Sequence, residues 1–273
     1  MLLLPQRIEK SLLRSELIIR LMQTDEVKIM TGAEPFFFPA GKVGCLLIHG
    51  ISGSPQQMRQ MGEYLAARGI TSHGVRLKGH GTRVEDMHNC TYRDWVASAE
   101  EGLSLLQEHC GTVFCAGLSM GGVISVRLAR RHPEEIRGLV TICSPYKLRS
   151  LKFKFIPLLK GIIKNFPTGA KSINDPDAYE VNYDYHSVPA VYQLIRLTAL
   201  MREDFRYINQ PALVFGARQD LVVDSRDPGL FYSQIASLEK ELVWLENSQH
   251  VATLDYDKEI IFQKTLDFIN KNQ

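Results

Sequence analysis

Residues 112–132 read TVFCAGLSMGGVISVRLARRH and decide the fold of this chain. The apolar run TVFCA leads into the pentapeptide Gly-Leu-Ser-Met-Gly (117–121), and a helical pattern of apolar and basic residues follows. A Gly-x-Ser-x-Gly match alone arises by chance in roughly one chain in ten of this length. A strand before it and a helix after it are the context of a nucleophile elbow, a strained turn that exposes the serine hydroxyl. The stretch therefore predicts a βα unit with Ser119 as a nucleophile.

Short apolar runs and longer amphipathic stretches alternate on both sides of this unit. Such alternation is typical of parallel strands joined by crossover helices. We therefore predict an α/β fold with a mostly parallel central sheet flanked by helices. The expected strands are 43–48, 71–75, 112–116, 137–143, 212–216 and 240–245, and the expected helices are 55–68, 92–109, 120–132 and 257–270.

One stretch interrupts this alternation. Residues 146–205 contain no recognisable βα unit, and we interpret them as a cap inserted into the fold. The α/β core then consists of residues 31–145 and 206–273, and residues 1–30 form an N-terminal extension. The sequence thus predicts one α/β domain with an insertion and an extension.

A serine nucleophile needs a general base, and the base needs an orienting carboxylate. Asp220 follows the expected strand ALVFG, and His250 follows the expected strand ending in ELVWLE. Because the carboxyl ends of parallel strands meet at one edge of a sheet, we expect both side chains near Ser119. Asp224 and Asp227 are alternative carboxylates, which we interpret as starting the next helix or facing solvent.

An oxyanion hole of this kind takes one backbone N–H from the residue after the nucleophile and one from the loop after the first core strand. Met120 supplies the first donor. In IHGISGSP the strand 43–48 ends at the dipeptide His49-Gly50, so Ile51 is the candidate for the second. We interpret His49 as holding this loop by hydrogen bonds rather than as an acid or base.

Composition excludes several classes of partner. The formal net charge is only +2 and the basic residues are spread along the chain, which argues against a nucleic-acid partner. Three of the five cysteines, Cys45, Cys115 and Cys143, lie in apolar runs and are expected in the core. No Cys or His cluster has the spacing of zinc ligands. We therefore expect no disulfide framework, no metal and no cofactor.

The N-terminal stretch MLLLPQRIEKSLLRSELIIRLM is apolar enough to suggest a signal peptide. Charged residues interrupt every apolar run, however, and a secretory signal does not tolerate them. We predict an amphipathic helix that packs against protein or lies on a membrane surface. No segment reaches the roughly 20 uninterrupted apolar residues of a spanning helix. The expected location is the cytoplasm, either free or at the inner face of the membrane.

Several motifs together resemble one known family. From about Gly32 to the C-terminus the chain resembles bacterial monoacylglycerol lipases and small carboxylesterases of the α/β-hydrolase superfamily. The motifs are HGISGSP (49–55), RLKGHGTRVEDM (76–87), DWVASAEEGL (94–103), GLSMGG (117–122) and NSQHVATLDYD (247–257). The resemblance implies the α/β-hydrolase fold and a catalytic triad of Ser119, Asp220 and His250. It also implies that the backbone of Ile51 and Met120 forms the oxyanion hole.

The same resemblance implies a function and a role for the cap. The substrate would be a monoacylglycerol, hydrolysed to fatty acid and glycerol through an acyl-enzyme. Residues 146–205 would form a lid with an apolar acyl tunnel and a polar pocket for glycerol. Glu180, in DPDAYEVNY, would bind that glycerol, unless it is a solvated carboxylate at a helix end. Two alternatives are a broad carboxylesterase or thioesterase on the same machinery, and a non-catalytic lipid-binding protein.

Residues 147–166 combine basic and apolar side chains without any acidic residue. One interpretation is that this segment dips into an anionic membrane surface and admits a lipid directly. The other is that the apolar residues line the tunnel and the lysines, among them Lys152 and Lys154, keep the lid soluble. The segment thus raises the hypothesis of peripheral membrane contact, through the cap or through the N-terminal helix.

Overall fold

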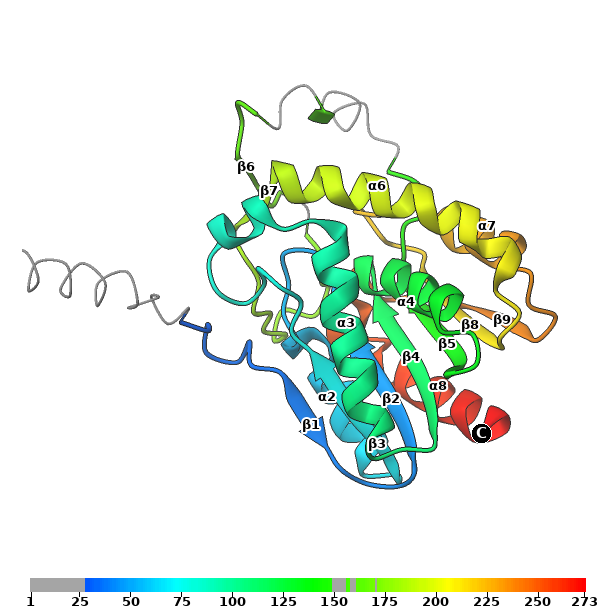
Figure 1. The fold of residues 1–273 in the computed structure, drawn as a ribbon. Helices are drawn as coiled ribbons and strands as arrows, with labels where there is room; N and C mark the ends of the chain where they lie inside the picture. The colour runs from blue at the N-terminus through cyan, green and yellow to red at the C-terminus, as the bar shows by residue number, and fades with distance from the viewer. Residues whose placement is uncertain (1–27, 149–155, 158–160, 170) are drawn as a thin grey trace, which may run out of the picture.

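A computed structural model of the chain describes residues 28–148, 156–157, 161–169 and 171–273. Its core is a seven-stranded sheet in the order β1-β3-β2-β4-β5-β8-β9 (Figure 1). The strands are β1 (Phe36–Phe38), β2 (Val43–Ile48), β3 (Ile70–Val75), β4 (Thr112–Leu118), β5 (Ile136–Ile142), β8 (Ala212–Ala217) and β9 (Lys240–Leu245). Only β1 runs antiparallel to its neighbour, so the prediction of a mostly parallel sheet is confirmed.

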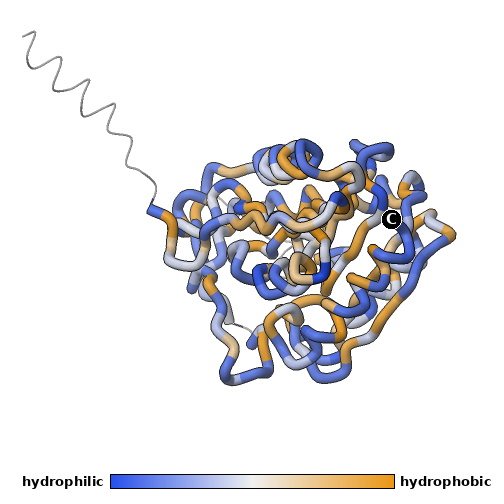
Figure 2. The backbone as a smooth tube through the Cα atoms, turned by 90° about the horizontal axis from the view of Figure 1, so that it is seen from below, coloured by the Kyte–Doolittle hydropathy of each residue, from blue (hydrophilic) through white to orange (hydrophobic). Residues whose placement is uncertain are grey.

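Helices cover both faces of this sheet (Figure 1). The helices of the described residues are α2 (Gln56–Ala66), α3 (Tyr92–Gln107), α4 (Met120–Arg131), α6 (Val188–Asp204), α7 (Asp227–Gln234) and α8 (Lys258–Asn272), with the short 3-10 helices η1 (Val84–Asn89), η2 (Phe205–Tyr207) and η3 (Ala252–Leu254). Along β2, Cys45 and Leu47 pack in one apolar cluster with α2 and α8. The alternate residues Leu46 and Ile48 pack in another with α3, α4 and α6, as the two-residue period of a strand requires. Figure 2 colours the chain by residue hydropathy and shows segments of apolar residues running through the interior, with hydrophilic segments outside.

The expected strands and helices of the core are all present, with ends shifted by a few residues. The pattern Thr91-x-x-Asp94 starts α3 as a capping box, in which the Thr91 N–H donates to the Asp94 carboxylate at 2.8 Å. The short edge strand β1 was not predicted. It has only three residues, between Pro35 and Pro39, and it is too short to show an alternating pattern.

The stretch without a recognisable βα unit holds one long helix and a small sheet. Between β5 and β8 the described residues form β6 (Asn165–Pro167) and β7 (Tyr185–Ser187), paired antiparallel, and then α6. The sequence prediction missed α6, although the Ser187 hydroxyl caps it by accepting the Ala190 N–H at 3.2 Å. Its apolar residues extend over more than one face, because it packs on α4, α3 and η1 at once. In Figure 1 it lies across the end of the sheet toward which β4 points.

Two predictions concern residues that the structure does not describe. The predicted N-terminal amphipathic helix falls almost entirely on residues 1–27, and Lys152 and Lys154 also lie outside the described residues. The division into core, cap and extension stays a prediction, because most of the extension and part of the cap are among these residues.

Candidate active site

Ser119 lies at a sharp turn between β4 and α4. Its backbone is in a conformation that L-residues rarely adopt, with φ +53° and ψ −116°, and its N–H donates to the Ile142 carbonyl at 2.8 Å. A Cβ on Gly117 would meet the backbone of Gly121, and one on Gly121 would meet the backbone of Ile48. The glycines two places on either side of Ser119 are therefore required by the close approach of strand, turn and helix.

Ser119, His250 and Asp220 form one chain of hydrogen bonds. The Ser119 hydroxyl lies 2.9 Å from His250 Nε2, and His250 Nδ1 lies 2.8 Å from Asp220 Oδ2. A carboxylate only accepts, so Nδ1 carries the ring proton and Nε2 is free to accept from the serine. The other oxygen of Asp220 accepts the N–H groups of Val222 and Val223, each at 2.8 Å. This arrangement can remove the hydroxyl proton as the serine attacks an electrophile.

The electrostatic surroundings favour the protonated form of His250. Burial alone would lower the pKa of this ring, but the charge and hydrogen bond of Asp220, with the charge of Glu180, raise it above its ordinary value. A stronger base takes the serine proton more readily, and the imidazolium that forms is stabilised by both carboxylates.

The two alternative carboxylates are engaged elsewhere. Asp224 accepts hydrogen bonds from the Arg226 guanidinium at 2.8 and 2.6 Å. Asp227 begins α7 as expected, but the alternative that it faces solvent is wrong. It is completely buried, because it accepts the N–H groups of Tyr146 and Lys147 at the start of the insertion. Both ring nitrogens of His250 are bonded to other residues, Nδ1 to Asp220 and Nε2 to Ser119.

The two predicted oxyanion donors, Met120 and Ile51, lie on either side of Ser119 in the structure, one following it in the chain and one in the pocket wall. Met120 is the first residue of α4, where an N–H has no acceptor within the helix. Ile51 lines the pocket beside Ser119, in the loop that follows β2. Both positions match the predicted oxyanion donors, and their part in catalysis stays a prediction.

The loop around Ile51 is fixed by His49, as the sequence suggested. His49 Nε2 accepts the Leu77 N–H at 3.2 Å, so its proton is on Nδ1, which donates to the Gly50 carbonyl at 2.8 Å. Burial, with the nearby His80, holds the pKa of His49 well below its ordinary value, so the ring is neutral. In a trans peptide the N–H points opposite to the carbonyl. The His49 bond to Gly50 therefore restrains the direction of the Ile51 N–H from the side of the core.

The triad opens into a pocket of about 530 Å³. Its apolar lining comes from the ends of β4 and β5, the loops after β8 and β9, and the insertion. It includes Leu118, Pro145, Leu148, Phe166, Val191, Leu194, Leu221, Val222, Val223 and Val251. Glu180 contributes a carboxylate to the wall, where it accepts from Gln57 at 2.7 Å and from Asn182 at 2.9 Å. Burial raises the pKa of Glu180, against the hydrogen bond from Gln57 and the charge of His250.

Sequence reasoning missed several polar residues of this pocket, among them Gln57, Ser172, Asn182 and His186. Gln57 follows the HGISGSP motif by two positions, and that proximity is the one signal that could have indicated it. The other three lie in the insertion, where no strand or helix pattern relates a residue to the edge of the sheet.

The loop of His250 is tied to the insertion through a buried aspartate. Asp255 accepts the N–H of Gln249, the residue before His250, at 2.7 Å. It also accepts the N–H groups of Asn174 and Asp175, at 2.8 and 2.9 Å. The LDYD segment after His250 therefore has a structural role, since it joins the histidine loop to the insertion.

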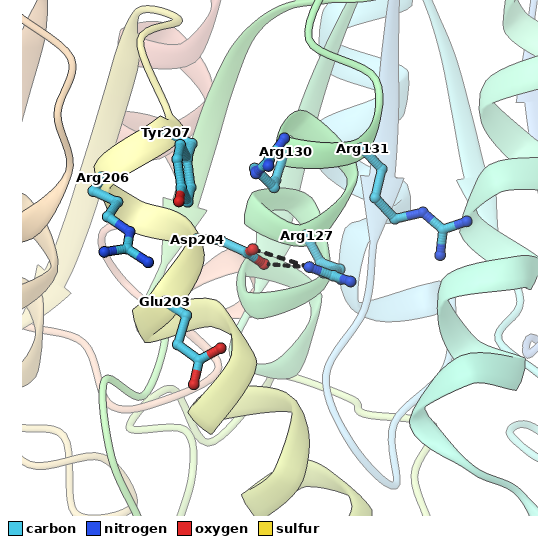
Figure 3. A pocket seen from close by; sticks show the side chains of 7 residues that line it. All are labelled: Arg127, Arg130, Arg131, Glu203, Asp204, Arg206 and Tyr207. Carbon is cyan, nitrogen blue, oxygen red and sulfur yellow. Dashed lines mark hydrogen bonds and ion pairs between the residues drawn. The ribbon is translucent and has the colours of Figure 1, made fainter.

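A second hollow, of about 470 Å³, lies at the C-terminal ends of α4 and α6 (Figure 3). Arg127 donates to both carboxylate oxygens of Asp204 at 2.9 Å, and Tyr207 lies between Arg130 and Arg206. Cations at helix C-termini offset the negative end of the helix dipole, which accounts for this cluster of arginines. Its lining has no serine, cysteine or histidine.

Within the described ranges, no group of three His, Cys, Asp or Glu side chains is placed to hold a metal ion. The five cysteines are buried free thiols, and burial raises the pKa of Cys45 to about 12. Among the helices of the described chain, none is long and apolar enough to cross a membrane.

Comparisons with known proteins agree with this geometry. The chain is 39% identical over 250 residues to the thermostable monoacylglycerol lipase of Bacillus sp. (strain H-257), covering 91% of this chain and 99% of that protein. It is 28% identical to the carboxylesterase of Bacillus subtilis (strain 168), covering 90% and 99%. A solved structure reported for LipS and LipT, two metagenome-derived lipolytic enzymes, is similar with a TM-score of 0.86 and 37% identity, covering 89% of this chain and 100% of that chain.

A family comparison covers most of the core and all three residues of the hydrogen-bonded chain. Residues 41–257 match the family described as serine aminopeptidase, S33. The matched range contains Ser119, Asp220 and His250, and it includes the insertion between β5 and β8. The chain therefore belongs to this α/β-hydrolase family.

Proposed function

We propose that this protein hydrolyses the ester bond of monoacylglycerols, releasing fatty acid and glycerol. The observation that carries the proposal is the unbroken chain from Asp220 through His250 to Ser119, which opens into an apolar pocket with one carboxylate, Glu180, in its wall. Similarity to a protein named monoacylglycerol lipase supports the choice of substrate.

The reaction runs through an acyl-enzyme. Ser119 Oγ attacks the ester carbonyl while His250 Nε2 takes the hydroxyl proton, and the Ile51 and Met120 N–H groups stabilise the tetrahedral oxyanion. His250 then gives its proton to the glycerol oxygen, which leaves. A water molecule activated by His250 releases the fatty acid from Ser119 in the second half of the reaction.

Glu180 is proposed to bind the glycerol part of the substrate. Its two oxygens accept from Gln57, Asn182 and, at 3.4 Å, Ser172, and a carboxylate has acceptor positions left for a substrate hydroxyl. This accounts for a charged group in a pocket that is otherwise lined by apolar side chains and neutral polar ones. The Glu180→Gln variant should raise KM for monoacylglycerols about tenfold, because a hydrogen bond to a charge is lost. Its KM for p-nitrophenyl butyrate, which has no glycerol, should stay the same.

Labelling by a serine-directed fluorophosphonate, followed by intact mass, tests the enzyme. The wild type should gain one adduct and Ser119→Ala none, and an unlabelled wild type would remove the proposal. Rates on monoacylglycerols, triacylglycerols and p-nitrophenyl esters of graded chain length then test the substrate. Preference for triacylglycerols would contradict the monoacylglycerol assignment and leave the hydrolase intact.

A second candidate is a broad carboxylesterase or thioesterase on the same residues. Similarity to a Bacillus subtilis protein named carboxylesterase favours it. Equal kcat/KM values for monoacylglycerols and simple alkyl esters of the same acyl chain would select this candidate. A non-catalytic lipid-binding role is disfavoured by the hydrogen-bonded triad, and turnover of any ester by the wild type but not by Ser119→Ala would exclude it.

We further propose that residues 146–205 form a lid and that its outer surface touches anionic membranes. Ile162 is 83% exposed beside the exposed Lys164, and Leu221 is 68% exposed at the pocket. Exposed apolar side chains beside lysines suit the boundary of an anionic bilayer. Sedimentation with liposomes should increase with anionic lipid, and Lys164→Glu with Ile162→Ser should reduce it. If sedimentation depends neither on the anionic lipid content nor on these two substitutions, the lysines serve only to keep the lid soluble.

A further inference from the structure

The proposed oxyanion donor Ile51 lies between two residues that are held in different ways. On one side, Gly50 donates its N–H to Gln57 Oε1 at 2.9 Å and accepts from His49 through its carbonyl. These anchors belong to the core. Because glycine has wide backbone freedom, the hydrogen bonds to Gly50 alone leave the backbone of Ile51 and Ser52 able to change conformation.

On the other side, Ser52 has a left-handed backbone with φ +62°. A non-glycine residue persists in this conformation only where its surroundings hold it. Ser52 is buried, and two of its polar atoms have partners in the insertion. Its carbonyl accepts the Tyr183 N–H at 3.0 Å, and its hydroxyl lies 3.0 Å from His186 Nδ1.

The partners of Ser52 belong to a continuous segment, residues 179–186, which we call the strap. The strap runs along the loop that follows β2 from Ser52 to the start of α2. Gln56 bonds to the backbone of Tyr179 and Val181, at 2.7 and 3.2 Å, and the Ser54 hydroxyl donates to the Val181 carbonyl at 2.9 Å. The loop is therefore held by the core at Gly50 and by the strap from Ser52 onward.

We propose that His186 is a positioning residue of the hydrolytic reaction, which acts by holding Ser52 in its left-handed conformation so that the Ile51 N–H points at the oxyanion. His186 also lines the pocket, and its ring packs against Phe166 at 5.2 Å between centroids. The strap thereby makes the oxyanion hole depend on the insertion. This inference rests on the proposed function, because it assigns Ile51 the part of an oxyanion donor.

Replacing His186 separates the hydrogen bond from the packing. His186→Phe keeps a ring against Phe166 and removes the contact to the Ser52 hydroxyl. We expect kcat for p-nitrophenyl butyrate to fall about tenfold with KM within twofold, since an oxyanion contact acts in the transition state. Loss of a whole donor costs more, about 10² to 10³. His186→Asn, whose amide nitrogen takes the place of Nδ1, should recover most of kcat.

A double-mutant cycle and a transition-state analogue test the route through Ser52. Ser52→Ala should lower kcat as His186→Phe does, and the double variant should lose no more than either single variant. Phenylboronic acid, which forms a tetrahedral adduct on serine, should bind the variants less tightly by the same factor as kcat falls. Multiplying losses in the double variant, or unchanged boronic acid binding, would overturn the proposal.

A hydrogen bond to the same small sheet provides a matched control. His88, in η1, has its Nε2 2.8 Å from the Asn165 side chain of β6, so this bond joins the insertion to η1 and not to the loop after β2. His88→Phe should keep kcat within twofold. Equal losses in His88→Phe and His186→Phe would mean that only the stability of the insertion matters. Absence of fluorophosphonate labelling in the wild type would instead reject the proposed function itself, and this inference with it.

Discussion

At the scale of single residues, Asp220 differs from the neighbouring Asp224 in what it holds in place. One oxygen of Asp220 accepts two backbone N–H groups, and the other faces His250 Nδ1. In Asp220→Asn the amide oxygen stays with the backbone donors, so the NH₂ group faces the ring. The ring proton then moves to Nε2, which can no longer accept from Ser119. We expect kcat to fall by about 10⁴, since the wrong tautomer is enforced.

Steady-state rates on p-nitrophenyl butyrate measure this loss, and circular dichroism checks the fold. Asp224→Asn is the matched control, because its carboxylate bonds to the exposed Arg226 side chain, whereas Asp220 is the carboxylate that bonds to His250 Nδ1. It should keep kcat within a factor of about two. Equal losses in both variants would show that the loop as a whole, and not the hydrogen bond to His250, carries the effect.

At the scale of helices and strands, the sequence predicts the regularly alternating strands and helices of the core, but it does not predict α6 or the contacts of the strap. The strands β2, β4, β5, β8 and β9 alternate with amphipathic helices, and this regular pattern places Ser119, Asp220 and His250 at one edge. The helix α6 has apolar side chains on several faces, so it has no single amphipathic stripe to reveal it. The contacts of the strap depend on how distant segments fold back, as in the pairing of Ser52 with His186. Local pattern carries no information about such pairs.

The helices α4 and α6 are joined by a partly buried ion pair, which predicts a large effect on stability. Asp204 is only 7% exposed in its side chain and receives two hydrogen bonds from Arg127 (Figure 3). Arg127→Met leaves that carboxylate buried without its partner, at a cost of about 2 to 3 kcal/mol in the free energy of unfolding. Urea denaturation measures the change. Replacing Asp204 by Leu in the same chain should restore part of it.

The neighbouring Arg131 provides the comparison for that prediction. It pairs with Glu100 at 3.0 Å, but its side chain is about half exposed. Exposed ion pairs contribute about 0 to 1 kcal/mol, so Arg131→Met should change the free energy of unfolding by less than 1 kcal/mol. A similar loss in both variants would mean that burial of Asp204 is not what makes the first pair important.

At the scale of the whole molecule, the sheet separates two apolar clusters, and the oxyanion loop rests on histidines buried in one of them. His49 and His80 pack edge to face at 5.0 Å, and His80 packs in the same way on Trp95 at 5.8 Å. Both rings are fully buried, so each must stay neutral in the folded chain. The geometry of the active site is therefore coupled to the stability of the fold at acid pH.

This coupling predicts acid instability. Burial is the main cause that lowers the pKa of His80 to about 4, although hydrogen bonds from the ring to the Lys78 and Leu77 carbonyls oppose it. Between pH 6.5 and 4 the unfolded chain binds a proton at this position that the folded chain does not, so the free energy of unfolding falls as pH falls. His80 alone contributes about 3 kcal/mol over this range, and His49 adds to it in the same direction. Urea denaturation from pH 7 to pH 5 gives the free energy of unfolding as a function of pH. This free energy should fall less steeply with falling pH in His80→Asn than in the wild type, whatever the stability of the variant at pH 7. The control His109→Gln, which replaces an exposed side chain, should show the same slope as the wild type. An unaltered slope in His80→Asn would mean that other groups govern the loss of stability in acid.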